Sequence, residues 1–323
     1  MTRLFRDVEG EVLCPRGSVV CIGAFDGLHL GHQALIGRAL ERARDCGLEP
    51  VALSFEPLPR EFFSGEKKPP RLLLPRAKFE GLRDLGMDRV GLLRFGPRLA
   101  TMAANEFVER VLMQRLGARE VWVGPEFRFG RSRGGDLALL QSMGATRGFS
   151  AHAIDAVMAG DERVSSSRIR AALVGGDLAT AAALLGRAYA ISGRVVRGRQ
   201  LGRKLGYPTA NLRLAGKTPA LSGIYASWVH GIGAQRRASV SSLGTRPTVL
   251  GIVPLLEAHL FDFDDDLYGR RIEVEFVAKL RDEEKFADLG ALVAQMHRDA
   301  AQARKILAKS LSPNVETQHG AAA

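Results

Sequence analysis

Cysteine is scarce in this sequence, and the few cysteines form no recognisable pattern. Cys14, Cys21 and Cys46 are the three cysteines among 323 residues, and neither a CxxC pair nor a Cys/His ligand spacing includes them. A disulfide framework and a zinc module are therefore excluded. The default expectation is a reducing, cytoplasmic compartment.

Long hydrophobic runs and aromatic residues are also few. The apolar runs are interrupted well before the roughly 18–20 residues that a membrane-spanning helix needs, and residues 1–17 lack the apolar core of a signal peptide. We therefore expect no membrane partner. Aromatic residues make up 7% of the chain and do not interleave with the basic residues, which argues against base-stacking platforms and against a nucleic-acid partner.

Glycine and positive charge, by contrast, are abundant. The chain has 36 glycines and a net charge of +11, while its 46% hydrophobic and 25% charged residues are ordinary globular values. Eight basic residues and no acidic residue lie between Arg187 and Lys217, where glycines also cluster. Such a segment attracts polyanions, and the glycines favour the phosphates of a nucleotide.

The first half of the chain alternates strand-like and helix-like segments. Strands are expected at 19–25, 51–55, 90–95 and 120–123, and helices at 32–46, 76–85 and 101–116. Alternation of this kind predicts an α/β, Rossmann-like domain whose parallel sheet is covered by helices on both faces. Phosphate ligands then belong at the carboxyl ends of the strands.

After Gly186 the pattern changes to strands separated by Gly, Pro and Asp turns. Strands are expected at 190–197, 223–230, 238–243, 255–263 and 271–280, with no helical pattern before 288–307. This predicts an antiparallel β-barrel or sandwich with a C-terminal helix. At roughly 100–200 residues per domain, we expect two domains, 1–186 and 187–310, followed by a disordered tail at 311–323.

The segment Gly23–His32, GAFDGLHLGH, stands where the first strand passes into the first helix. Gly23 permits a sharp turn there, and His29 and His32 lie at the helix start, where free N–H groups and the helix dipole favour an anion. Imidazoles can donate hydrogen bonds to phosphate oxygens. A metal-binding histidine pair and ordinary helix-start residues are the alternatives, but the complete string favours phosphate handling.

A second glycine-rich segment begins at Gly193 and ends in the sequence PTAN, Pro208–Asn211. Its glycines, interleaved with basic residues, suit a loop that folds over phosphates. Thr209 and Asn211 offer two neutral oxygen ligands two residues apart, which suits Mg²⁺ bound together with water and phosphate oxygens. The residues that we expect to contact the nucleotide are Gly193, Gly198, Gly202, Arg203 and Gly206.

These motifs together resemble a known enzyme family. GAFDGLHLGH, SFEPLPREFF (Ser54–Phe63), VGPEFRFGRSRGG (Val123–Gly135) and VSSSRIR (Val164–Arg170) resemble the adenylyltransferase half of prokaryotic bifunctional riboflavin kinase/FAD synthetases, and Leu184–Leu212 resembles the junction with the kinase half. The resemblance runs in order from about Val19 to Leu307. It implies phosphorylation of riboflavin to FMN in the second domain and adenylylation of FMN to FAD in the first. The implied substrates are riboflavin, FMN and ATP, with Mg²⁺ as cofactor and FMN and FAD as products.

In the first domain the resemblance also implies roles for individual residues. His29 and His32 contact the ATP phosphates, and Arg170 closes on the triphosphate from another helix start. The further nucleotide-binding residues are Gly23, Phe25, Asp26, Gly31, Ser165 and Ser166. Phe62 and Phe127 are implied to line the flavin slot, although core packing explains them equally well. The serines of VSSSRIR also fit a simple N-cap on a helix over 168–174.

In the second domain Glu257 matches the family's catalytic glutamate, the base that a kinase acting on an alcohol needs. Its alternative is a solvent-facing strand glutamate, with Leu256 and Ala258 pointing inward. Arg281 and Asp282 match positions at the flavin end of the site. The acidic run Asp264–Asp266 is interpreted as a turn.

A few positions depart from the family pattern. Ser242 stands where asparagine is usual, and Glu126 replaces Asp or Asn before Phe127, which leaves a flavin or adenine contact there open. Ser167 replaces Thr and Ala188 replaces Pro. The functional alternatives are a nucleotidyltransferase for another phosphorylated metabolite and a basic RNA-binding barrel. The oligomeric state stays open.

Overall fold

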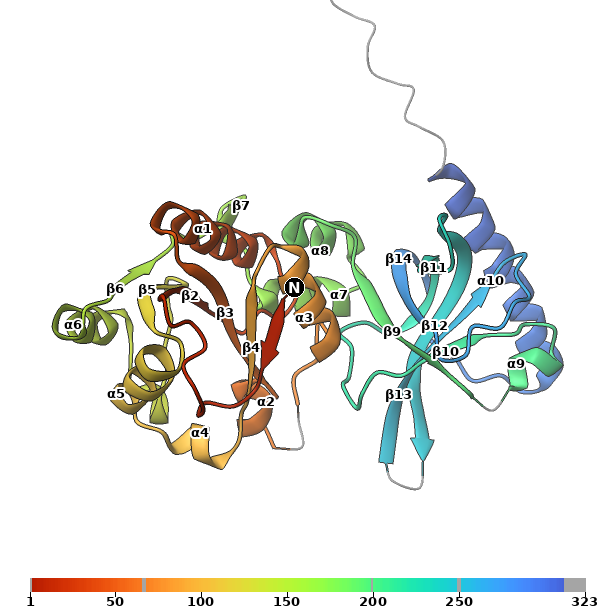
Figure 1. The fold of residues 1–323 in the computed structure, drawn as a ribbon. Helices are drawn as coiled ribbons and strands as arrows, with labels where there is room; N and C mark the ends of the chain where they lie inside the picture. Colours follow the sequence, from red (N-terminus) through yellow and green to blue (C-terminus); the bar gives the residue numbers. More distant parts are fainter. Residues whose placement is uncertain (1, 66–67, 199, 249–250, 311–323) are drawn as a thin grey trace, which may run out of the picture. The chain divides into compact units, whose positions relative to one another are not determined.

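A computed structural model describes residues 2–65, 68–198, 200–248 and 251–310 of the chain (Figure 1). The chain divides into two compact units. The first comprises Met1–Arg170 with Ala183–Arg187, and the second comprises Ala171–Ala182 with Ala188–Ala323. The predicted tail at 311–323 lies outside the described residues.

The first unit is built on a parallel sheet of six strands, in the order β1-β4-β3-β2-β5-β6. The strands are β1 (Arg3–Phe5), β2 (Ser18–Ile22), β3 (Glu49–Glu56), β4 (Arg89–Arg94), β5 (Ala118–Val123) and β6 (Ser150–Ala153). The predicted parallel sheet is confirmed. The edge strands β1 and β6 were not predicted, because they are short and partly exposed and so lack a continuous apolar run.

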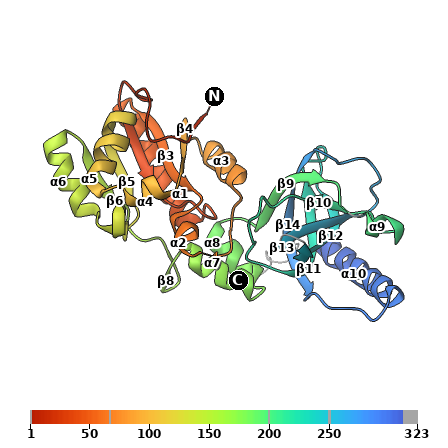
Figure 2. The same ribbon diagram turned by 90° about the horizontal axis from the view of Figure 1, so that it is seen from below.

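Helices cover both faces of this sheet (Figures 1 and 2). Val19 and Cys21 of β2 pack in one core with residues of α1 and α3, whereas Val20 and Ile22 pack in a second core with residues of α5, η1 and α6. Alternate residues of a strand point to opposite faces, so a fully buried strand shows no polar alternation. The helices of this unit are α1 (Leu30–Cys46), α2 (Pro59–Phe63), α3 (Pro75–Asp84), α4 (Pro97–Thr101), α5 (Ala104–Phe107), the π-helix η1 (Val108–Arg115), the 3₁₀ turn η2 (Arg131–Arg133) and α6 (Leu137–Arg147).

The helix expected over 101–116 is present as α5 and η1, but it begins later than predicted. Helix α4 ends at Thr101, Met102 is extended with ψ 127°, and a new helix begins at Ala104. A short hairpin, β7 (Met158–Ala159) and β8 (Glu162–Arg163), follows β6, and helices α7 (Ser166–Val174) and α8 (Leu178–Leu185) lead into the second unit.

The second unit contains a closed barrel in the order β10-β13-β12-β11-β14-β9, and all of its pairings are antiparallel. The strands are β9 (Ala190–Val196), β10 (Ala210–Leu212), β11 (Gly223–His230), β12 (Arg237–Thr248), β13 (Gly251–Leu260) and β14 (Arg271–Arg281). The predicted barrel with its C-terminal helix, α10 (Leu289–Lys309), is confirmed. The expectation of no earlier helix is wrong, because α9 (Leu201–Lys204) forms one turn within the glycine-rich segment.

Helix α10 packs on the outer face of the barrel. Ala300, Ala303 and Leu307 of the helix share a hydrophobic core with Trp228 and Phe261 of the barrel. The helix therefore shields some outward-pointing residues of β12 and β13 from solvent. A cleft can form between the barrel wall and the helix.

Candidate functional sites

The GAFDGLHLGH loop connects the carboxyl end of β2 with the start of α1. Three of its residues, Phe25, Gly27 and Leu28, adopt positive φ, which folds the loop tightly. His29 is the N-cap of α1, and its Nδ1 accepts a hydrogen bond from the His32 backbone N–H at 3.3 Å. Because Nδ1 accepts, the proton of a neutral His29 ring lies on Nε2, which can donate to a ligand.

The two histidine rings stack on one another. Their centroids are 3.6 Å apart with 16° between the planes, and the Phe25 ring packs edge-on against His32. A cavity of about 340 Å³, which we call the histidine cavity, lies beside them. Of the predicted residues it brings together Gly23, His29, Gly31, His32, Phe127, Ser165 and Ser166.

Burial keeps both imidazoles uncharged. Desolvation lowers the pKa of His29 to about 4, and desolvation together with the positive charges nearby lowers the pKa of His32 well below its usual value. Among the described residues no group of three or more His, Cys, Asp and Glu side chains could hold a metal ion. The pair therefore offers neutral N–H donors, which suit an anionic ligand.

These pKa shifts predict that the first unit loses stability in mild acid. For a histidine whose pKa is about 4 in the folded protein and about 6.5 in the unfolded chain, the free energy of unfolding is highest above pH 6.5. It decreases as the pH falls toward 4, because the unfolded chain then binds a proton that the folded protein does not. The slope is at most about 1.4 kcal/mol per pH unit for each such histidine. Urea unfolding of a Trp228→Phe variant measures it, because the remaining tryptophan, Trp122, belongs to the first unit. The double variant His29→Asn, His32→Phe should show a shallower slope between pH 6.5 and 4.5, and an unchanged slope would contradict this origin.

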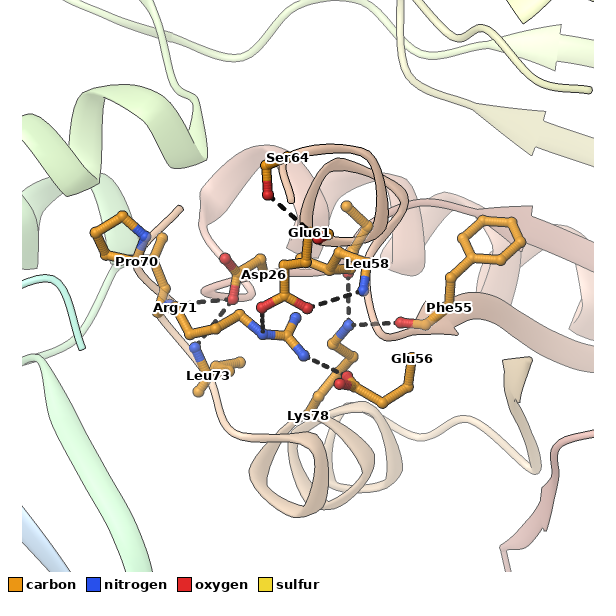
Figure 3. A network of polar contacts seen from close by, with 12 residues as sticks. Asp26, Phe55, Glu56, Leu58, Glu61, Ser64, Pro70, Arg71, Leu73 and Lys78 are labelled. Carbon is orange, nitrogen blue, oxygen red and sulfur yellow. Dashed lines mark hydrogen bonds and ion pairs between the residues drawn. The ribbon is translucent and has the colours of Figure 1, made fainter. Parts of the chain in front are cut away.

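The carboxylate of Asp26 does not line the histidine cavity but ties the loop to the rest of the unit (Figure 3). Its Oδ1 accepts hydrogen bonds from the backbone N–H groups of Leu72 and Leu73 at 3.1 and 3.0 Å. Its Oδ2 accepts one from Arg170 Nη2 at 2.5 Å. The Asp26 carboxylate thus anchors the loop that carries the histidines, and its contact with the nucleotide stays a prediction.

Arg170 is buried beside this anchor. Its Nε donates to the Pro70 carbonyl at 2.7 Å, and its Nη1 is buried without a hydrogen-bond partner in the described part of the chain. Arg170 does not line the histidine cavity, whereas Ser165 and Ser166 do. Ser165 Oγ accepts from the Arg168 N–H, as an N-cap does, and Ser166 Oγ donates to the Asp26 carbonyl at 2.8 Å. The N-cap interpretation of VSSSRIR is thus met by Ser165, while Ser166 connects α7 to the loop.

A second cavity of the first unit, about 510 Å³, is rich in phenylalanine. We call it the aromatic cavity. It is lined by Phe55, Phe63, Phe95, Phe107, Phe127 and Phe129, with several arginines at its edge. Phe127 lines both this cavity and the histidine cavity. Phe62 does not line it, but its ring packs against the lining residues Phe63 and Phe95 with centroids 5.2 and 5.4 Å away.

In the second unit, the strand register brings the predicted kinase residues together. Glu257 of β13 pairs with Asn211 of β10 on one side and with Ser242 of β12 on the other. Thr209 Oγ1 donates to Glu257 Oε1 at 3.4 Å. Leu256 and Ala258 are fully buried inside the barrel, and Glu257 points outward as the strand period requires.

Outward does not mean exposed at this position. Glu257 lines a cavity of about 400 Å³, the barrel cavity, together with residues of α10 such as Met296 and Asp299. Ser242 and Thr209 line the same cavity. The two interpretations of Glu257 are thus compatible, because the helix covers the face of the barrel to which the glutamate points.

Asn211 has the environment of a metal ligand. The side chain is 5% exposed, and its Oδ1 is buried without a hydrogen-bond partner among the described residues. Its Nδ2 donates to the Thr209 carbonyl at 3.3 Å, which turns the amide oxygen away from that backbone. A Cβ at Gly198 would lie 2.8 Å from the Asn211 amide, so the glycine-rich segment approaches this side chain closely. A buried, unsatisfied oxygen next to Thr209 fits a hard cation such as Mg²⁺.

The other residues predicted in the glycine-rich segment are more dispersed. Gly202 lines the barrel cavity, and a Cβ there would lie 2.3 Å from the Tyr207 carbonyl oxygen. Arg203 lines a smaller neighbouring cavity that also reaches Thr209. Gly206, two residues after the end of α9, adopts a positive φ of 81°. Gly193 lies within β9, opposite Ile272, and lines neither cavity.

The two predicted flavin contacts of this unit differ in position. Arg281 lines the barrel cavity, where it forms an ion pair with the buried Asp299 at 2.7 Å and lies 5.6 Å from the Phe286 ring centroid. Asp282 is 81% exposed, pairs with Lys279 and does not line the cavity. The acidic run at Asp264–Asp266 forms a turn, in which Asp266 accepts the Tyr268 N–H.

Several residues at the sites were not predicted. Arg163 lines the histidine cavity and pairs with Glu126 at 2.9 Å, so the longer acidic side chain at this position reaches across to the β7–β8 hairpin. Tyr207 and His259 line the barrel cavity. Tyr207 stands directly before PTAN. His259 is two residues after Glu257 on β13, so the two side chains lie on the same face of the strand. This two-residue spacing is the sequence signal from which His259 could have been predicted.

Comparisons with known proteins match the two parts of the chain to two different families. A family model described as FAD synthetase matches residues 12–168, and one described as riboflavin kinase matches residues 185–307. In the described part of the chain no helix is both long and apolar enough to cross a membrane.

Curated relatives match over nearly the whole chain. The bifunctional riboflavin kinase/FMN adenylyltransferase of Escherichia coli K12 is 42% identical over 304 residues, which cover 94% of this chain and 97% of the relative. That of Pseudomonas fluorescens is 44% identical and covers 91% and 94%. A crystal structure described as a macrolide-efflux protein from Streptococcus pneumoniae superposes with a TM-score of 0.77 at 29% identity, over 94% of this chain and 98% of that one. By these matches the chain belongs to the bifunctional riboflavin kinase/FMN adenylyltransferase family.

Proposed function

We propose that this protein makes FAD from riboflavin in two ATP-dependent steps. The second unit phosphorylates riboflavin to FMN, and the first adenylylates FMN to FAD with release of pyrophosphate. One observation carries the proposal: each family match falls on a unit that holds its own cavity lined by residues suited to phosphate chemistry. The domains are 1–186 for adenylyl transfer and 187–310 for the kinase.

In the kinase step Glu257 acts as the general base. Its carboxylate takes the proton of the ribityl 5′-hydroxyl as that oxygen attacks the γ-phosphorus of ATP, and the bond to the β,γ-bridging oxygen breaks to release ADP. Thr209 holds the carboxylate in place through its hydroxyl. Arg281, fixed by Asp299, binds the flavin at its end of the same cavity. Asp282, exposed next to Arg281 in sequence, contacts the flavin from outside the cavity lining.

Thr209 and Asn211 are the residues that would hold Mg²⁺. Held by these two side chains, Mg²⁺ would supply positive charge to offset that of the ATP phosphates. The buried Asn211 Oδ1 supports this assignment, since it has no partner within the described chain. The loop over the phosphates is formed by Gly198, Gly202, Arg203 and Gly206. Gly193 lies in β9, the strand that precedes this loop.

In the adenylyl transfer the FMN phosphate is itself the nucleophile. One of its oxygens attacks the α-phosphorus of ATP, and pyrophosphate leaves, so the protein needs no nucleophile of its own. His29 and His32 donate hydrogen bonds to the phosphates as charge builds on them. Ser165 and Ser166 bind the nucleotide beside Gly23 and Gly31, while Phe25, Asp26 and Arg170 hold the loop around it. Phe127 and the Phe62–Phe63 pair lie on the flavin side.

We also propose a cytoplasmic location with no nucleic-acid or membrane partner. Two of the three cysteines are buried thiols, and burial raises the pKa of Cys14 to about 11 and that of Cys21 to about 12, so neither is a reactive thiolate. The basic charge of the 187–217 segment is assigned to Mg-ATP.

The direct test incubates the full chain with riboflavin and Mg-ATP and separates the flavins by chromatography. FMN should appear first and FAD should follow, and FMN supplied with ATP should yield FAD without riboflavin. Folded protein that forms neither product would overturn the proposal. FMN without FAD would instead favour a nucleotidyltransferase for another phosphorylated acceptor.

A further inference from the structure

Arg60 is a cavity residue that the reactions above do not use. It lies in α2 and lines the aromatic cavity beside Phe63 and Phe127. Among the described residues its guanidinium forms no hydrogen bond or ion pair, although the acidic residue Glu61 is its neighbour in sequence. An arginine at the edge of an apolar cavity without a carboxylate partner is a candidate receptor for an anion.

The carboxylates near Arg60 are already bound to other cations (Figure 3). Glu61 is 3% exposed, pairs with Arg71 Nε at 2.9 Å and accepts the Leu58 N–H at 3.0 Å. Glu56 also pairs with Arg71, and Lys78 is fully buried with its Nζ donating to the Ala24 carbonyl at 2.9 Å. This network fixes the backbone of α2 near the Gly23–His32 loop, while the exposed Arg60 guanidinium meets the charges of Glu61 and Asp26 without a hydrogen bond or ion pair to either of them in the described part of the chain.

Arg60 lines the aromatic cavity, not the histidine cavity, and its charge interacts with that of Arg170. Burial and then the positive charge of Arg170 lower the pKa of the Arg60 guanidinium, so the two cations act on one another. Asp26 compensates Arg170 only through Nη2, and Nη1 of Arg170 remains buried without a partner in the described chain. An anion bound near both arginines would relieve their repulsion and satisfy their free N–H groups.

We infer that Arg60 binds the phosphate of FMN and makes the adenylyl-transfer site selective for the phosphorylated flavin over riboflavin. The inference rests on the proposed function, which places the flavin ring in the aromatic cavity. FMN and riboflavin share the ring and the ribityl chain and differ in the phosphate alone. A site built around a charged hydrogen-bonding group rejects an analogue that lacks the group, because the arginine is then left unpaired.

The other arginines of the aromatic cavity are less suited to this role. Arg128 pairs with Asp136 at 2.9 Å. Arg131 and Arg133 belong to η2, which is tied to the segment between α4 and α5 by the hydrogen bond from Arg131 N–H to the Met102 carbonyl. Arg60 is the arginine of this cavity that acts on Arg170, next to the loop of the histidine cavity where the attacked ATP would lie.

The test measures FAD formation from FMN in the full chain, with lumiflavin as a competing ligand. Lumiflavin has the flavin ring but neither ribityl chain nor phosphate, so it reports on the ring site alone. Arg60→Gln should raise the KM for FMN by about 10- to 100-fold, the range expected for loss of a charge-assisted hydrogen bond. The inhibition constant of lumiflavin and the KM for ATP should stay unchanged, and Arg60→Lys should restore part of the loss. Arg44→Gln, which removes an exposed arginine outside these cavities, is the matched control.

Two outcomes separate the inference from the function on which it rests. If Phe127→Ala, which truncates the ring shared by the two cavities, leaves the binding of both flavins unchanged, the flavin does not occupy the aromatic cavity and the proposed site fails. If Phe127→Ala weakens both flavins but Arg60→Gln leaves the ratio of FMN to lumiflavin affinity as in the wild type, the site stands and the role of Arg60 is overturned. The role of Arg60 would also be overturned if Arg131→Gln changed the ratio of FMN to lumiflavin affinity and Arg60→Gln did not.

Discussion

Replacing Glu257 by glutamine should abolish most riboflavin phosphorylation while FAD formation from supplied FMN continues. Loss of a general base typically slows a reaction by about 10²- to 10⁴-fold. Glutamine has nearly the same size, and its carbonyl oxygen can still accept the hydrogen bond from Thr209 Oγ1 that Glu257 accepts. The change therefore removes the proton acceptor and keeps the packing. FAD formation should persist because His29, His32 and the cavity they line belong to the other unit.

The matched control is Glu273→Gln. Glu273 is also a strand glutamate of the barrel, but it is exposed on β14 and lines neither cavity of the second unit. Surface substitutions of this kind usually change stability by no more than about 0.5 kcal/mol. Rates of FMN formation, measured with saturating Mg-ATP, should be normal in this control. Near wild-type turnover in Glu257→Gln would mean that the base lies elsewhere or that water suffices.

Most of the architecture could be predicted because it follows from periodicity. The interior strands β2 to β5 each contain a short apolar run, and the barrel strand β14 alternates polar and apolar residues in its first half. The elements that were missed have weak periodic signals. The edge strand β1 has three residues, and α9 is a single turn in a glycine-rich segment. The break at Met102 depends on tertiary packing, which periodicity does not contain.

The cavities were predicted in part for a similar reason. Residues of one motif, such as His29 and His32, share an element, so their proximity can be inferred from spacing. The pair Asp26–Arg170 joins residues 144 positions apart, and the pairing of Arg71 with Glu56 and Glu61 depends on how α2 meets the loop before α3. Such long-range pairings have no local pattern. Sequence reasoning therefore did not predict that the Asp26 carboxylate is held by Arg170 and by the backbone of the loop before α3.

Removing the histidine donors should lower FAD formation strongly and leave FMN formation intact. Each donor lost from a charged transition state costs on the order of 2.7–4 kcal/mol, or about 10²- to 10³-fold in rate. Alanine is a poor choice at these positions, because His29 also caps α1 and loss of an N-cap costs about 1 kcal/mol of stability. His29→Asn retains an acceptor for the His32 N–H and removes the ring that donates through Nε2.

His32→Phe is the sharper of the two variants. His32 Nδ1 is buried without a hydrogen-bond partner in the described residues, so an apolar ring costs little there, and phenylalanine can keep both the stacking on His29 and the edge-on contact with Phe25. The thermal unfolding of the first unit should thus be nearly normal while adenylyl transfer falls. Assays of both reactions on one preparation decide the matter. An equal loss of FMN and FAD formation in folded protein would contradict the division of labour, and normal FAD formation would mean that the stacked histidines shape the loop without touching the phosphates.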